Sequence, residues 1–148
     1  MYASNKICEE LAATYTNFKQ LKKEKFVGYK LVNKKNLNYY SIVSGLFRYK
    51  PRNVAHNSYS NLYKKTKNLF NEKLDDRLAI FKNQEDAINF LIEYKNIEDP
   101  EFKIDLVLLE ITISKDLEEA QCSNKFCKNL EVVIGGVIEK VKEIKKVN

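Results

Sequence analysis

The sequence predicts a single α+β domain, residues 1–148, with a mostly antiparallel sheet of about six strands, three helices, and a helix at its N-terminal end. The first observation is that 148 residues with 44% hydrophobic content suit one domain with one core. The second is that strand-like and helix-like apolar patterns both occur, without the regular strand–helix alternation of a parallel α/β fold. We find no internal repeat or linker.

Three segments have the apolar spacing of amphipathic helices. The first, 5–23, follows Ser4 as a candidate N-cap. The second is 58–74, with its lysines outside the apolar stripe. The third, 84–95, follows Asn83, with Asp86 at the reciprocal position of a capping box. The stripe of the first helix consists of Ile7, Leu11, Tyr15, Phe18 and Leu21.

Strands are predicted where β-branched and aromatic residues cluster between turn residues. The segments are 26–33, 39–44, 46–50, 77–82, 104–114 and 130–134. Both alternating sets of 104–114 are apolar, which predicts a central strand buried on both faces. Residues 117–128 suggest a short helix followed by a loop.

The C-terminal segment 137–144 fits two structures. Gly135-Gly136 is typical of a tight turn, which favours a hairpin with 130–134 and places Glu131 opposite Lys140. The apolar spacing of the segment fits a helix instead. We favour the hairpin because of the turn residues.

Charge is distributed unevenly along the chain. Residues 1–74 hold 15 Lys plus Arg against 4 Asp plus Glu, a balance of +11, whereas residues 75–148 hold 11 against 16, a balance of −5. The stretch 25–71 has ten Lys or Arg, many aromatic residues and no acid. Such a surface suits a polyanionic partner, or the acidic half of a second copy in a salt-sensitive oligomer.

We therefore predict a small non-enzymatic binding protein that docks on an acidic protein or nucleoprotein complex. Its role would be that of an inhibitor or accessory factor, and the abundance of Lys and Asn fits a virus or mobile element with an A- and T-rich genome. The predicted binding residues are Lys30, Lys34, Lys35, Arg48, Tyr49, Lys50, Arg52, Lys64, Lys65 and Lys67.

Direct nucleic-acid binding is an alternative interpretation of the same stretch. Lysines would contact phosphates, and tyrosines such as Tyr39, Tyr49 or Tyr63 could stack on bases. With 23 Lys and 3 Arg, the chain is poor in the residue that makes bidentate contacts to guanine. This composition favours contacts to the backbone over sequence-specific readout.

Common catalytic and cofactor patterns are absent from the sequence. His56 is the only histidine and lies in a polar stretch, while Cys8, Cys122 and Cys127 are interpreted as reduced structural thiols of a cytoplasmic protein. Glycine-rich phosphate loops do not occur. We predict no metal, no cofactor and no membrane span, and we expect Glu110, inside the most apolar strand, to pair with a cation.

One family resemblance suggests an enzymatic alternative. The order of Gly28–Val32, Tyr39–Ile42, Ala79–Lys82 and the helix Glu85–Leu91 resembles small ADP-ribosyltransferase-like α+β domains over roughly 26–144. The resemblance implies NAD-dependent transfer. Active members carry His or Arg on the first strand, where this chain has Tyr29 or Lys30. Under this alternative, Tyr29, His56, Ser58 and Glu110 are the polar residues that should converge in one cleft.

Overall fold

A computed structural model describes residues 13–41, 48–51, 78–90 and 105–147. These residues form eight strands and one short helix. The elements are β1 (Thr14–Gln20), β2 (Lys25–Lys35), β3 (Asn38–Tyr40), β4 (Leu78–Phe81), α3 (Gln84–Asn89), β5 (Leu106–Ser114), β6 (Glu118–Ser123), β7 (Leu130–Gly135) and β8 (Val137–Lys146). The prediction of six strands with three helices and an N-terminal helix is therefore wrong. The predicted helix 58–74 lies outside the described residues.

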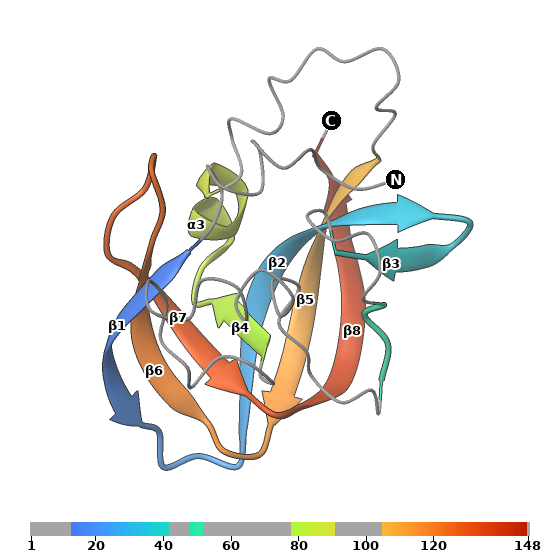
Figure 1. Cartoon of the computed structure of the whole chain (residues 1–148). Helices are drawn as coiled ribbons and strands as arrows, with labels where there is room; N and C mark the ends of the chain where they lie inside the picture. Colours follow the sequence, from blue (N-terminus) through green and yellow to red (C-terminus); the bar gives the residue numbers. More distant parts are fainter. Residues whose placement is uncertain (1–12, 42–47, 52–77, 91–104, 148) are drawn as a thin grey trace, which may run out of the picture.

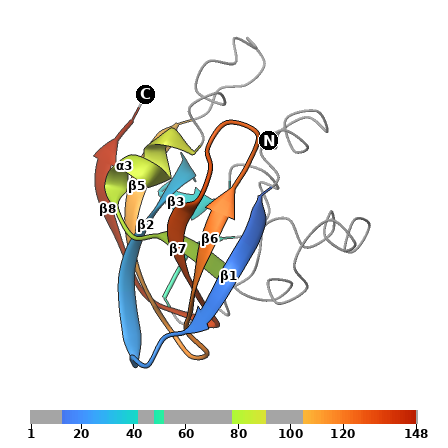
Figure 2. The same cartoon turned by 90° about the vertical axis from the view of Figure 1, so that its left-hand side faces the viewer.

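All eight strands belong to one antiparallel sheet, in the order β1-β6-β7-β4-β2-β5-β8, with β3 paired to β2. Figure 1 shows that the strands twist strongly and that β1, β6 and β7 lie on one side of the molecule, with β5 and β8 on the other. Figure 2, turned by 90°, shows β1 at the near edge. The helix among the described residues is not long and apolar enough to span a membrane.

The central strands of the sheet are buried on both faces, because their apolar residues alternate between two core clusters. Leu106 and Leu108 of β5 belong to the cluster that includes α3, whereas Val107 and Leu109 belong to the other. The prediction of a central β5 is confirmed: it pairs with β2 on one side and β8 on the other. Gly135 at the end of β7 lies against Ile113 of β5, although β4 and β2 separate these two strands in the sheet. The sheet therefore curves back on itself.

The predicted N-terminal helix is wrong over its described part, where residues 14–20 form strand β1. Asn17 has a φ of 57°, and the pairing of β1 with β6 shifts between Thr16 and Lys19. This β-bulge lets Tyr15 and Phe18, three positions apart, pack against the same core cluster. A bulged strand thus acquires the three-residue apolar spacing that is typical of a helix.

The segment 137–144 is a strand, but it does not form the predicted hairpin. β7 pairs with β4 and β6, whereas β8 pairs with β5. Glu131 therefore lies opposite Gln121, and Lys140 lies opposite Thr112. Gly135-Gly136 carries the chain around the corner of the curved sheet, where the Gly136 amide donates to the carbonyls of Ser114 and Lys115. Two register shifts in the pairing of β8 with β5 account for its helix-like spacing.

Of the remaining secondary-structure predictions, some are confirmed and some are wrong. Strands near 26–33, 77–82 and 130–134 are confirmed as β2, β4 and β7. The predicted helix in 117–128 is wrong, because β6 occupies residues 118–123. Of the strand predicted at 46–50, the described part makes one isolated bridge, between Tyr40 and Arg48.

Helix α3 begins directly after Asn83, the predicted N-cap. The Asn83 side chain accepts a hydrogen bond from the Asp86 amide at 2.9 Å and donates to the Asp86 carboxylate at 3.0 Å. This reciprocal arrangement satisfies a backbone donor at the helix start. Ala87 is buried on α3, and Phe90, just after the helix, packs on Phe81 of β4 with ring centroids 5.1 Å apart.

Candidate binding surface at the β2–β3 hairpin

The β2–β3 hairpin ends in a two-residue turn. Lys35 pairs with Asn38, so Asn36 and Leu37 form the loop, with φ values of 52° and 67°. Two positive φ values at the central positions of a two-residue hairpin define a type I′ turn. Asparagine tolerates this conformation, but leucine does so only with strain. Leu37 is also 85% exposed, so nothing in the fold itself requires an apolar side chain there.

Residues 48–51 lie against this hairpin. Arg48 forms a bridge with Tyr40 and donates from its guanidinium to the Asn38 side-chain oxygen. The amide of Tyr49 donates to the carbonyl of Tyr39 at 2.9 Å, and the Tyr49 ring is buried. Because Tyr49 points into the core, its neighbours Arg48 and Lys50 are exposed on the surface.

Lys34 is held by an acid of strand β8. Its ammonium lies 2.9 Å from Oε1 of Glu143, which also accepts a hydrogen bond from the Tyr39 hydroxyl at 3.1 Å. The hydrogen bond to Glu143 raises the pKa of Lys34, and burial followed by the same hydrogen bond raises the pKa of Tyr39. Lys34 is therefore charged at neutral pH but largely compensated.

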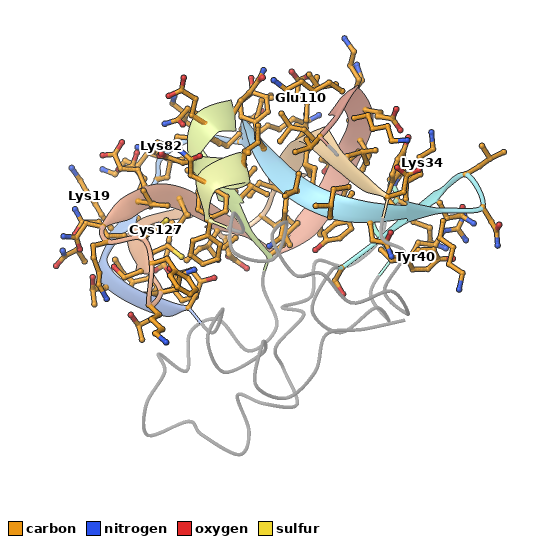
Figure 3. The ribbon with its side chains drawn as sticks, turned by 90° about the horizontal axis from the view of Figure 1, so that it is seen from above. Lys19, Lys34, Tyr40, Lys82, Glu110 and Cys127 are labelled. Atoms are coloured by element: carbon orange, nitrogen blue, oxygen red, sulfur yellow. The ribbon has the colours of Figure 1, made fainter. Side chains whose placement is uncertain are left out.

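The ten predicted binding residues do not all lie on one exposed surface. Arg52, Lys64, Lys65 and Lys67 lie outside the described residues. Lys35, Arg48 and Lys50 are exposed cations at the hairpin end, and Lys34 belongs to the same end with Glu143 as its partner. Figure 3 shows Lys34 and Tyr40 together at this end, far from Lys19 and Lys82. We call Lys35, Asn36, Leu37, Arg48 and Lys50 the hairpin surface.

Two of the predicted residues are buried or partly buried. Tyr49 is 2% exposed, and burial raises its pKa. Lys30 donates from its ammonium to the carbonyl of Ala79 at 3.0 Å, and burial lowers its pKa to about 8, an effect that the nearby Cys122 thiol partly offsets. The Tyr49 side chain is therefore not available to a partner, and the partly buried Lys30 is engaged through its ammonium by the Ala79 carbonyl.

Lys30 occupies the place where β2 separates from β4. Only Tyr29 and Phe81 pair between these strands. Carbonyls two residues apart on a strand point to the same side, so the Ala79 carbonyl faces β2, as that of Phe81 does. The Lys30 ammonium supplies the hydrogen bond that a longer ladder would have provided.

Sequence analysis missed a basic contribution from strand β8. Lys145 pairs with Leu108 and is exposed, and Lys146 pairs with Val107 and lies 3.3 Å from Asp105. Both lie two strands from β2, near the base of the hairpin. The C-terminal cluster of lysines was a visible signal, but the acidic balance of the second half of the chain concealed it.

The residues of the enzymatic alternative are only partly placed. Tyr29 lies directly opposite Glu110, and Glu110 in turn lies opposite Lys142 on β8. His56 and Ser58 lie outside the described residues. The half-buried Glu110 thus has a cation as its cross-strand neighbour, although no ion pair within 4.0 Å joins the two.

Within the described ranges the two cysteines are free thiols. Cys122 is buried, which raises its pKa to about 12, and burial likewise raises the pKa of Cys127. A thiol with a raised pKa is a poor nucleophile at neutral pH. Across the ranges 13–41, 48–51, 78–90 and 105–147, no three His, Cys, Asp or Glu side chains are grouped to hold a metal ion.

A shallow hollow of about 150 Å³ lies at the opposite end of the sheet from the hairpin. Its walls include Lys82, which lies 3.0 Å from Glu119 and 4.0 Å from Glu131. The Lys82 hydrogen bond lowers the pKa of Glu119. This is a partly exposed ion-pair network whose charges already compensate each other.

Comparisons with protein-family models, curated proteins and solved structures find no match for this chain. The functional argument therefore depends on the residues and geometry described above.

Proposed function

We propose that the chain is a small non-enzymatic binding protein that docks through the hairpin surface on an acidic protein or nucleoprotein complex. It would act there as an inhibitor or accessory factor. The observation that carries the proposal is the convergence of the exposed Lys35, Arg48 and Lys50 on one hairpin.

The distribution of acidic residues supports the hairpin surface as the docking surface. Residues 33–41 and 48–51 contain no Asp or Glu. Among the described residues, Glu143 is engaged by Lys34 and Tyr39, and Asp105 lies 3.3 Å from Lys146. An acidic partner would meet the exposed side chains of Lys35, Arg48 and Lys50, and complementary charge accelerates encounter and selects the partner.

The proposed compartment is the cytoplasm. Cys122 and Cys127 are free thiols, the state that a reducing compartment maintains.

The test is co-purification from the extract of the native cell. The tagged chain is recovered at moderate salt, with and without nuclease, and the retained molecules are identified. The same experiment is performed with the triple variant Lys35→Glu, Arg48→Glu, Lys50→Glu. A matched control, Lys22→Glu, Lys25→Glu, Lys115→Glu, makes the same charge change on exposed residues at the far end of β2.

The proposal predicts that one defined complex is retained by the wild type and by the control, and is lost by the hairpin variant. Equal retention by both variants would show that the hairpin surface is not the docking surface. Recovery of no complex by the wild type would overturn the proposal as a whole.

A further inference from the structure

Leu37 combines two features that are unfavourable for an isolated protein. Its φ of 67° lies in the left-handed region, where a Cβ is strained, and its side chain is 85% exposed. Glycine would satisfy this turn position better. Strain at an exposed position is a reason to look for function, because folding does not explain the residue.

The side chains around Leu37 are amides and cations. Asn36 is the exposed neighbouring loop residue, and Asn38 accepts a hydrogen bond from the Arg48 guanidinium. Lys35 closes the turn on the other strand. The tip therefore presents one aliphatic side chain, neutral amides beside it, and cations behind it.

This combination matches the chemistry of the DNA minor groove. Proteins that bind there use Arg, Lys and Asn for the groove edges and insert aliphatic wedges such as leucine between base pairs. The minor groove is about 6 Å wide and displays hydrogen-bond acceptors, which suit amide donors. A two-residue turn at the end of a two-stranded ribbon is narrow enough to present a single side chain to it.

Single-stranded nucleic acid is a poorer match. Sequence-tolerant single-strand binding depends on aromatic rings on which bases stack. At this end of the molecule, the Tyr49 ring is buried, the Tyr39 hydroxyl is bound to Glu143, and Tyr40 is half-buried. The residue at the apex is aliphatic, which suits insertion between stacked base pairs.

We propose that the β2–β3 hairpin binds duplex DNA with Leu37 as an apolar wedge in the minor groove, while Lys35, Arg48 and Lys50 contact the flanking phosphates. This inference rests on the proposed function, since it assigns DNA as the component of the nucleoprotein complex that the hairpin surface touches. The competing target is an acidic protein surface, and the experiment below distinguishes it from DNA.

The experiment uses the purified full chain and a 24-base-pair duplex with an A·T-rich centre that carries 2-aminopurine. Fluorescence of 2-aminopurine increases when the base is unstacked. The wild type should bind with a slope of log affinity against log salt of about −3, from three phosphate contacts. It should also raise the fluorescence and be displaced by a minor-groove ligand such as netropsin.

Leu37→Gly is the decisive variant. It should weaken DNA binding about 10-fold and abolish the fluorescence increase, with an unchanged salt slope because all cations remain. It should also raise Tm, because glycine relieves the strained turn. Leu37→Met, which keeps a flexible apolar side chain, should retain both binding and fluorescence. Lys35→Gln should instead reduce the steepness of the salt slope by about 1.

Equal affinity and equal fluorescence for wild type and Leu37→Gly would overturn the proposal that Leu37 acts as a wedge. Absence of duplex binding by the wild type would overturn DNA as the target. If, in that case, the charge-reversal variant still loses a nuclease-resistant complex from extract, the proposed function stands and the hairpin binds protein.

Discussion

The ammonium of Lys34 on β2 lies 2.9 Å from Oε1 of Glu143 on β8, so the strand that carries the hairpin is linked to the edge of the described sheet by an ion pair. The Tyr39 hydroxyl donates to the same oxygen. Glu143 thus orients the hairpin and at the same time removes one positive charge from the field that a partner meets.

Glu143→Gln should therefore strengthen docking. The amide keeps the shape of the side chain but removes the negative charge beside the Lys34 ammonium, so the hairpin end gains one unit of positive charge. We expect about 2- to 5-fold tighter binding to the retained complex and elution from heparin at higher salt. Glu24→Gln, the same charge change on an exposed residue before β2, is the control and should have a smaller effect.

Lys30→Met should stabilise the fold at neutral pH. The pKa of Lys30 is lowered to about 8 from 10.5, so below pH 8 the folded state carries a buried charge at a cost. We expect a gain of about 1–2 kcal/mol in the free energy of unfolding at pH 7, after allowance for the lost hydrogen bond to Ala79.

The stability gain from Lys30→Met should depend on pH. Between pH 8 and 10.5 the unfolded chain holds a proton on Lys30 that the folded chain has released, so the stability contribution of this residue rises with pH in that window. The advantage of Lys30→Met over the wild type should shrink from pH 8 to pH 10 in urea unfolding. Lys25→Met, on the exposed end of the same strand, is the matched control.

Glu119→Gln should lower the free energy of unfolding at neutral pH. The Lys82 hydrogen bond holds the pKa of Glu119 below 4.5, so its contribution is present above that value and is lost as pH falls through the folded pKa. For a partly exposed pair we expect a loss of about 0.5–1 kcal/mol at pH 7 that diminishes as the pH falls below 4.5. Glu131→Gln, whose oxygen lies 4.0 Å from Lys82, should cost less; an equal cost would contradict the assignment.

Gly28→Ala should destabilise the sheet where β2 crosses β4. A Cβ on Gly28 would lie 2.6 Å from the Phe81 carbonyl oxygen and 2.7 Å from Cδ1 of Ile80. The backbone cannot yield as a flexible side chain can, so we expect a loss of about 1–3 kcal/mol. Gly136→Ala, whose Cβ would have no neighbour closer than 3.4 Å, is the matched control for thermal unfolding.

Strands with regular alternation and a helix with a local cap could be predicted from the sequence. β5 was identified because both of its faces are apolar, and α3 because Asn83 and Asp86 interact locally. Strand β1 could not be identified, since the bulge at Asn17 replaces the two-residue period with a three-residue one. Strand β6 was missed because its inward residues, Ala120 and Cys122, give a weak apolar signal.

The candidate surface was predicted in charge but not in geometry. A run of Lys and Arg indicates that cations lie in one stretch, but only the fold decides which are exposed. Alternation on β2 and anchoring by Tyr49 separate the partly buried Lys30 from the exposed Lys35 and Lys50. Leu37 carried no signal in the sequence, because its importance depends on a backbone φ and on exposure at a turn.

The most direct test of the docking account is hydrogen exchange, measured by mass spectrometry, of the chain alone and bound to the complex recovered by co-purification. Docking through the hairpin surface predicts that the increase in amide protection is concentrated in residues 33–41 and 48–51. Protection concentrated in β1, β6 and β7, with these two segments unchanged, would contradict it.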